Sequence, residues 1–192
     1  MIRNDLNLIR VLEENGVVVM PTDTLYGIVG RAQEASVVNR IYDLKKRTSL
    51  KPCIILIGDI SELEKFSITL NREQRKIIEK YWSFNFTQDK TEPVSIVLDC
   101  PNDSFAYLHR GTRTLAFRVP TFKPFREFLL NVGPLLAPSA NPEGLPPAKD
   151  IFEAKDYFGD KVDLYVDGGI ITGKASRLVK LYRDGSEAIL RI

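Results

Sequence analysis

Short apolar runs alternate with segments of helical spacing along the whole chain, and this alternation constrains the fold most. The clearest run, residues 53–57 (CIILI), is continuously apolar, as expected for a strand buried on both faces. We predict further strands near 17–20, 94–98, 114–119, 135–137, 162–166, 177–182 and 187–191. We predict helices over 5–15, 34–45, 59–66, 71–82 and 124–131, and a short helix capped by Asp150. Interleaved strands and helices predict an α/β fold with a mixed sheet.

The composition limits the class of protein. The chain has 192 residues, with 27 Lys and Arg against 25 Asp and Glu, which argues against a general nucleic-acid coat protein. Cys53 and Cys100 lack partners at metal-ligand spacing, so we predict small core residues in a reduced protein and no metal site. Neither a signal peptide nor an apolar run of about 20 residues is present, so we expect a cytoplasmic protein, away from membranes. No linker-like stretch divides residues 1–192, which we expect to form a single domain.

Polar side chains follow several of the predicted strands. Residues 21–27 (PTDTLYG) come directly after the apolar run 16–20, and Ser139 and Asn141 follow another buried strand. Polar groups at the ends of core strands are where α/β proteins hold small ligands. Arg118 lies near the end of an apolar strand and must find an anion or reach solvent, so a carboxylate ligand is a natural partner.

A cationic run lies between a predicted helix and the strand at 53–57. It comprises Lys45, Lys46, Arg47 and Lys51. Cations commonly favour helix C-termini, which would explain the first three. Because four cations are held between two core elements, they could also neutralise a polyphosphate.

Two other features carry no function in our interpretation. Residues 168–175 (GGIITGKA) nearly match a phosphate-binding P-loop, but Ala175 replaces the required Ser or Thr, and the residues that follow alternate like a strand. His109 is the sole histidine, and we predict a loop position without a catalytic role.

Six motifs in order give a family resemblance. The matching segments are 21–27 (P-T-[DE]-T-x-Y-G), 45–52 (K-x-R-x-x-x-[KN]-P), 114–120 (T-x-x-x-R-[IV]-P), 138–141 (P-S-A-N), 167–176 (D-G-G, then a serine) and 189–191 (I-L-R). Together they resemble the YrdC-like family, the threonylcarbamoyl-AMP synthases. The resemblance implies an open, twisted mixed sheet flanked by helices around a basic concave pocket. It also implies formation of threonylcarbamoyl-AMP and pyrophosphate from L-threonine, bicarbonate and ATP, for the modification of tRNA adenosine 37.

The resemblance implies residue roles as well. Lys45 and Arg47 would hold the triphosphate, and Ser139 and Asn141 would position the nucleotide phosphate and the carbamate; these four form the expected catalytic set. The expected threonine site consists of Thr24, Tyr26, Arg118 and Ser176. Thr114 and Arg191 would contact the nucleotide, together with Ser139, and Mg²⁺ would accompany ATP with phosphates and water as its main ligands. Asp23 would only fix its turn.

The sequence departs from the family's motifs in two places, and these departures keep other functions open. The usual W-P-G-P-x-T is missing, and S-T-V has become residues 176–178 (SRL), which puts the cation Arg177 beside the expected threonine pocket. One alternative is a paralogue that transfers a carbamoyl group from another donor. Another is a non-catalytic RNA-binding module of the same fold. Partners beyond the substrates would be tRNA or the transferase proteins of tRNA modification.

Overall fold

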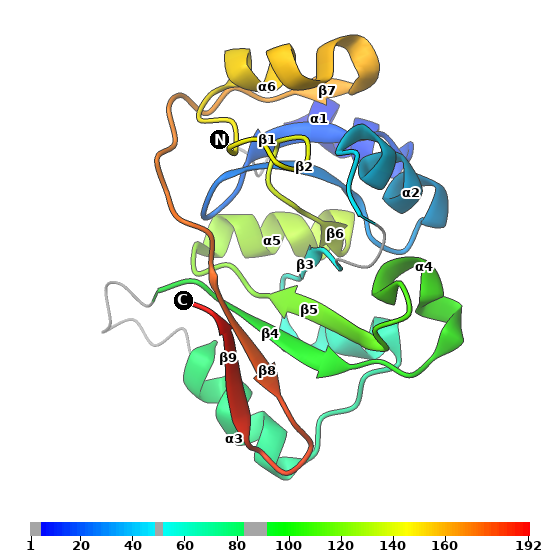
Figure 1. Cartoon of the computed structure of the whole chain (residues 1–192), viewed down its shortest axis with the longest axis vertical. Coiled ribbons are helices and arrows are strands. Elements are labelled where there is room, and N and C mark those ends of the chain that lie inside the picture. The colour runs from blue at the N-terminus through cyan, green and yellow to red at the C-terminus, as the bar shows by residue number, and fades with distance from the viewer. Residues whose placement is uncertain (1–4, 49–51, 83–91) are drawn as a thin grey trace.

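The computed structural model describes residues 5–48, 52–82 and 92–192. Its strands are β1 (Val18–Pro21), β2 (Tyr26–Arg31), β3 (Ile54–Leu56), β4 (Val94–Asp99), β5 (Thr114–Arg118), β6 (Leu135–Leu136), β7 (Leu164–Tyr165), β8 (Arg177–Leu181) and β9 (Glu187–Arg191). These nine strands form one sheet in the order β7-β1-β2-β6-β3-β5-β4-β8-β9 (Figure 1). β1 with β7, β3 with β5 and β4 with β8 are parallel, and the other neighbours are antiparallel. The predicted mixed α/β fold is confirmed.

Helices pack against both faces of the sheet. They are α1 (Leu6–Glu13), α2 (Ala35–Leu44), α3 (Arg72–Tyr81), α4 (Ala106–His109), α5 (Lys123–Val132) and α6 (Ile151–Phe158), with 3₁₀ helices η2 (Ile60–Phe66), η3 (Asp103–Phe105) and η4 (Gly159–Lys161). One apolar cluster joins α1 and α5 to one face. A larger cluster joins α2, α3 and α6 to the other. In β3, Leu56 belongs to the first cluster and Ile55 to the second, which confirms the strand buried on both faces.

Local capping explains where several helices begin. The carboxylate of Asp5 accepts a hydrogen bond from the Leu8 amide, and that of Asp150 accepts from the Phe152 and Glu153 amides. Asn71 and Gln74 form a capping box at the start of α3. The predicted caps at Asn71 and Asp150 are therefore confirmed.

None of the described helices is long and apolar enough to cross a membrane.

Strand β2 was not predicted. Residues 22–25 form the turn of a hairpin, and its second strand begins at Tyr26. Glycines at 27 and 30 interrupt the apolar pattern that would indicate a strand. Gly30 is needed for packing, because a Cβ there would lie 2.3 Å from Val37 Cγ1 of α2. The close helix–strand contact thus requires a glycine that breaks the apolar pattern, and the strand could not be recognised from the sequence.

Other local predictions need correction. The helix predicted over 59–66 is present as a 3₁₀ helix over residues 60–66, and β7 is shorter than predicted. His109 ends α4 instead of lying in a loop, and only 3 % of it is exposed. Strand β8 follows residues 168–175, so the rejection of a P-loop is confirmed, since a P-loop opens a helix. Lys51 lies outside the described residues, as do residues 83–91 of a loop that the polar, irregular sequence predicts over 83–92.

Candidate functional site

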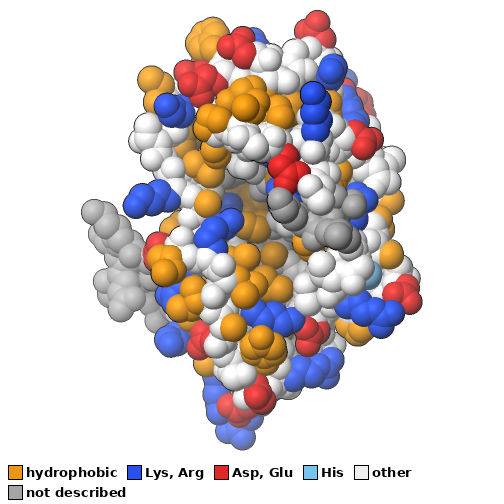
Figure 2. All heavy atoms as spheres, in the orientation of Figure 1, with side chains coloured by type: hydrophobic (Ala, Val, Ile, Leu, Met, Phe, Trp, Pro, Cys, Tyr) orange, Lys and Arg blue, Asp and Glu red, His pale blue; other side chains and the backbone are white. Residues whose placement is uncertain are grey.

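A cavity of about 280 Å³ opens on one face of the molecule. Figure 2 shows this face hollowed near its centre, with hydrophobic side chains at the bottom of the hollow. The cavity's basic side chains are Arg47, Arg118 and Arg191, and its hydroxyls come from Thr22, Thr24, Ser139 and Ser176. Ile54, Ala116, Ala137 and Leu178 supply apolar surface. Among the described lining residues there is no carboxylate, so the cavity suits an anionic ligand.

The sheet topology brings the separate motifs together. β2 pairs antiparallel with β6, and the pairing continues as a bridge between Gly27 and Ser139. The amide of Ala140 donates to the Tyr26 carbonyl at 2.8 Å. The hairpin turn and the segment after β6 therefore form adjoining walls of one cavity, as the sequence motifs predicted.

The hairpin turn is held by its own hydroxyl. Thr22 Oγ1 donates to the Leu25 carbonyl at 2.7 Å and accepts from the amides of Thr24 and Leu25, each at 3.3 Å. Thr24 Oγ1 lies 3.3 Å from Thr22 Oγ1. A turn with this many internal bonds fixes the direction of the side chains that it carries.

Asp23 does more than fix the turn. Its Oδ1 accepts from Arg118 Nη2 at 2.8 Å and its Oδ2 from Arg118 Nε at 3.2 Å. Each side chain of this ion pair is only 4 % exposed. The anion that the sequence required for Arg118 is thus a residue of the chain, and the pair has the two-bond geometry of strong Arg–carboxylate contacts.

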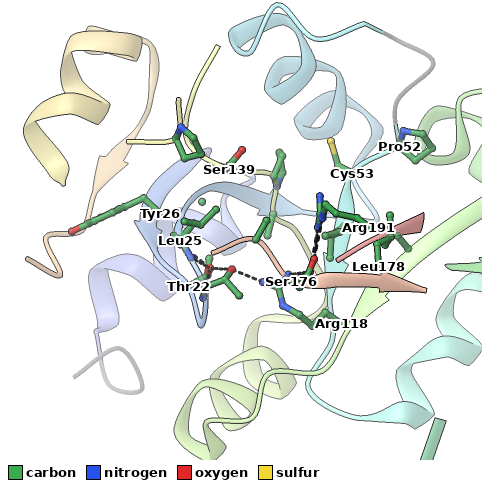
Figure 3. A pocket seen from close by; sticks show the side chains of 18 of the residues that line it. Thr22, Leu25, Tyr26, Pro52, Cys53, Arg118, Ser139, Ser176, Leu178 and Arg191 are labelled. Atoms are coloured by element: carbon green, nitrogen blue, oxygen red, sulfur yellow. Dashed lines mark hydrogen bonds between the residues drawn. The ribbon is translucent and has the colours of Figure 1, made fainter. Parts of the chain in front are cut away.

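Ser176 connects two of the arginines (Figure 3). Its Oγ accepts from Arg118 Nη1 at 3.3 Å and lies 2.8 Å from Ser95 Oγ. Its carbonyl accepts from Arg191 Nε at 3.0 Å and Nη2 at 2.7 Å. Ser95 was missed from the sequence, although a lone hydroxyl within the apolar strand 94–98 was the available signal.

Two guanidinium groups of the cavity act on the third, Arg191. Burial lowers the pKa of Arg191, and the positive charges of Arg118 and Arg47 lower it further. Because Asp23 balances the charge of Arg118 and no carboxylate is among the described lining residues, the positive charge offered to a ligand lies toward Arg47 and Arg191. A polyanion would therefore be favoured at that end of the cavity.

Lys45 lies beneath the cavity and is 1 % exposed. Its Nζ donates to the carbonyls of Ser139 and Asn141, both at 2.5 Å, and to Asn141 Oδ1 at 3.4 Å. Ser139 Oγ donates to the same Oδ1 at 2.6 Å. Burial lowers the pKa of Lys45 to about 8. Lys45 and Asn141 thus hold the turn that presents Ser139, and neither lines the cavity.

The other members of the cationic run lie apart. Arg47 lines the cavity, and its Nη2 donates to the Pro52 carbonyl at 3.4 Å. Lys46 is exposed and does not line the cavity, while Lys51 is not among the described residues. In the described part of the run, Arg47 is therefore the cation placed to meet a ligand.

Tyr26 lines the cavity with its ring, but its hydroxyl points away from it (Figure 3). The hydroxyl donates to the Gly169 carbonyl at 2.9 Å and accepts from the Gly168 amide at 2.8 Å. Burial raises the pKa of this phenol, which keeps it protonated as a donor. Tyr26 thereby anchors the segment that leads from β7 to Ser176.

Thr114 and Arg177 also lie outside the cavity lining. Thr114 begins β5 and faces the same side as Ala116 and Arg118, but its Oγ1 donates to Thr112 Oγ1 at 3.2 Å. Arg177 alternates with the cavity residue Leu178, and its charge lowers the pKa of Tyr81. The expectation that Arg177 lies beside the threonine pocket is wrong, because successive strand residues point to opposite faces.

The described residues contain no group of three or more His, Cys, Asp or Glu side chains that could hold a metal ion. Any cation that enters with a ligand would meet hydroxyl oxygens at the described cavity wall.

Comparisons with known proteins agree with this architecture. The model of the Sua5/YciO/YrdC family, described as "Telomere recombination", matches residues 10–192. The threonylcarbamoyl-AMP synthase of Bacillus subtilis is 33% identical over 162 residues, which cover 83% of this chain and 44% of that protein.

Solved structures show the same fold. Sua5 of Pyrococcus abyssi, crystallised in complex with L-threonine, gives a TM-score of 0.79 at 25% identity over 99% of this chain and 53% of that chain. YciO of E. coli gives 0.78 at 20% identity, over 99% of this chain and 87% of that chain. The chain thus spans about half the length of the Bacillus and Pyrococcus proteins. With a family model matched over residues 10–192 and the family's motifs gathered around one cavity, the chain belongs to the Sua5/YciO/YrdC family.

Proposed function

We propose that the protein is an L-threonylcarbamoyladenylate synthase, a nucleotidyltransferase. The observation that carries this proposal is one cavity with two kinds of anion site. Arg118 is balanced by a carboxylate and flanked by hydroxyls, whereas Arg47 and Arg191 bring positive charge to a described lining that contains no carboxylate. A zwitterionic amino acid suits the first site and a nucleotide triphosphate suits the second. The resemblance to a threonylcarbamoyl-AMP synthase supports the same assignment.

The amino-acid end would hold threonine. A guanidinium has five N–H donors, and four hydrogen bonds join Arg118 to Asp23, Thr24 and Ser176. One N–H on Nη1 remains for the carboxylate of threonine, and the hydroxyls of Thr24 and Ser176 are near enough to assist. The complex of a family member with L-threonine supports this substrate.

The reaction needs positioning and charge neutralisation more than covalent help. The threonine amine captures bicarbonate as a carbamate with loss of water, and a carbamate oxygen attacks the α-phosphorus of ATP. The bond to the β-phosphate oxygen breaks, and pyrophosphate leaves. Arg47 and Arg191 would neutralise the leaving group, as cations do in other phosphate displacements. Ser139 would orient the nucleotide, with Lys45 and Asn141 holding its turn and adding positive charge from below.

Magnesium would enter with ATP, held mainly by phosphate oxygens and water. We place Thr114 at the edge of the nucleotide site, since it shares a strand face with Ala116 and Arg118. The product would serve tRNA adenosine-37 modification, with tRNA or its transferase proteins as partners. A cytoplasmic setting agrees with two buried free thiols, Cys53 and Cys100.

Pyrophosphate release tests the proposal. The protein is incubated with ATP, Mg²⁺ and bicarbonate, with and without L-threonine. Pyrophosphate release that requires threonine is expected. Equal pyrophosphate release with and without threonine would contradict the proposal. Replacing threonine and bicarbonate by carbamoyl phosphate, with AMP release as the readout, would instead identify a carbamoyl-transferring paralogue. Tight tRNA binding without turnover would identify an RNA-binding module.

A further inference from the structure

We propose that Asp23 is a positioning residue that determines which part of the cavity binds the amino acid and which part binds phosphate. It holds Arg118 with its Nη1 edge toward the amino acid, and it keeps phosphate groups away from that end. The inference rests on the proposed function and extends it to Asp23, which the sequence analysis assigned only to a turn.

The geometry makes Asp23 a rigid support. Its two oxygens occupy the Nε and Nη2 side of Arg118, at 3.2 and 2.8 Å, and both side chains are almost completely buried. The turn that carries Asp23 is locked by the three hydrogen bonds of Thr22 Oγ1. Arg118 can therefore present only Nη1, whose other contact is Ser176 Oγ.

The charge balance gives Asp23 a second effect. An unpaired Arg118 would add a third positive charge beside Arg47 and Arg191, where the charge of Arg47 already lowers the pKa of Arg191. Phosphate is a stronger ligand than a carboxylate for such a cluster because it carries more charge. Paired with Asp23, Arg118 offers directed hydrogen bonding without net charge, which suits a zwitterion and discriminates against a polyanion.

The test compares Asp23→Asn with the wild type and with Asp43→Asn, which removes an exposed carboxylate on α2. We measure KM for threonine and for ATP, and inhibition by inorganic phosphate. In Asp23→Asn the threonine KM should rise roughly tenfold or more, as expected for loss of charge-assisted hydrogen bonds, with little change in the ATP KM. Phosphate should become competitive with threonine in this variant alone. An unchanged threonine KM, or no competition by phosphate, overturns the inference.

A second variant guards against misfolding. Asp23→Glu keeps the charge but displaces the carboxylate, so it should raise the threonine KM while phosphate remains a poor competitor. Wild-type threonine KM in Asp23→Glu, or phosphate competition equal to that in Asp23→Asn, contradicts the inference. If the wild type itself releases no pyrophosphate in response to threonine, the proposed function fails; phosphate binding to wild type and Asp23→Asn, measured by calorimetry, then still decides the role of Asp23.

Discussion

The Nζ of Lys45 donates to the Ser139 carbonyl at 2.5 Å, so a lysine beneath the cavity fixes a serine on its wall. The same ammonium reaches the Asn141 carbonyl and side-chain oxygen. An ammonium has three N–H groups, and these three acceptors can use all of them. Lys45 therefore shapes the cavity from beneath, while Arg47 faces its interior.

Burial of Lys45 gives a pH-dependent stability. Its pKa is about 8 in the folded protein against 10.5 for an ordinary lysine. Between these values the unfolded chain binds the proton more tightly, so the free energy of unfolding rises with pH. Relative to a Lys45→Met variant, the wild type should gain about 2.5 kcal/mol between pH 7 and pH 10. Urea denaturation of both proteins at both pH values measures the gain, and a difference independent of pH would show that the pKa of Lys45 is not lowered.

Arg177 provides a control for substitution of Arg191, because only Arg191 lines the cavity. Arg191 lines the cavity and holds the Ser176 carbonyl, whereas Arg177 faces the other side of β8. Arg191→Ala should raise the KM for ATP roughly tenfold or more, because a charged contact to the nucleotide is lost. Arg177→Ala should leave both substrate KM values close to wild type. Equal effects of the two substitutions in steady-state kinetics would refute the placement of the nucleotide.

Tyr26 anchors the segment after β7 through its hydroxyl. Tyr26→Phe removes the bonds to Gly168 and Gly169, and it should lower the free energy of unfolding by about 1–3 kcal/mol. The Gly168 amide should exchange its hydrogen faster. Tyr165→Phe, which removes one bond to the Gly159 carbonyl, is the control and should leave Gly168 unchanged. Unaltered exchange at Gly168 in Tyr26→Phe would contradict the anchoring role.

Gly173 passes too close to the hairpin turn to carry a side chain. A Cβ there would lie 2.0 Å from the Thr24 carbonyl oxygen, so either backbone must move. Gly173→Ala should destabilise the protein by about 1–3 kcal/mol and raise the threonine KM, because the displaced turn carries Asp23. The exposed neighbour provides the control, since Thr172→Ala should be nearly neutral. Thermal unfolding and kinetics that match the wild type in Gly173→Ala would contradict the close contact.

The sequence predicted the parts of the site that depend on local pattern. Apolar runs located most strands, and Asn71 and Asp150 gave correct helix starts because capping is a local interaction. The family motifs named Arg47, Arg118, Ser139, Ser176 and Arg191, all of which line one cavity.

Pairing across long sequence separations could not be predicted. The partner of Arg118 is 95 residues away, and that of Lys45 is 94 residues away, so neither follows from local spacing. Asp23 was assigned only to its turn because its partner was unknown. β2 was missed because its two glycines have low strand propensity, and Gly30 is required there by close packing against α2.

The most direct test of the proposed function follows the bicarbonate carbon. The protein is incubated with ATP, Mg²⁺, L-threonine and ¹³C-bicarbonate, and the products are examined by NMR and mass spectrometry. The account predicts a labelled carbamoyl carbon joined to both threonine and AMP, formed together with pyrophosphate and absent when threonine is omitted. Cleavage of ATP without transfer of the label into a threonylcarbamoyl adenylate would contradict the proposed function.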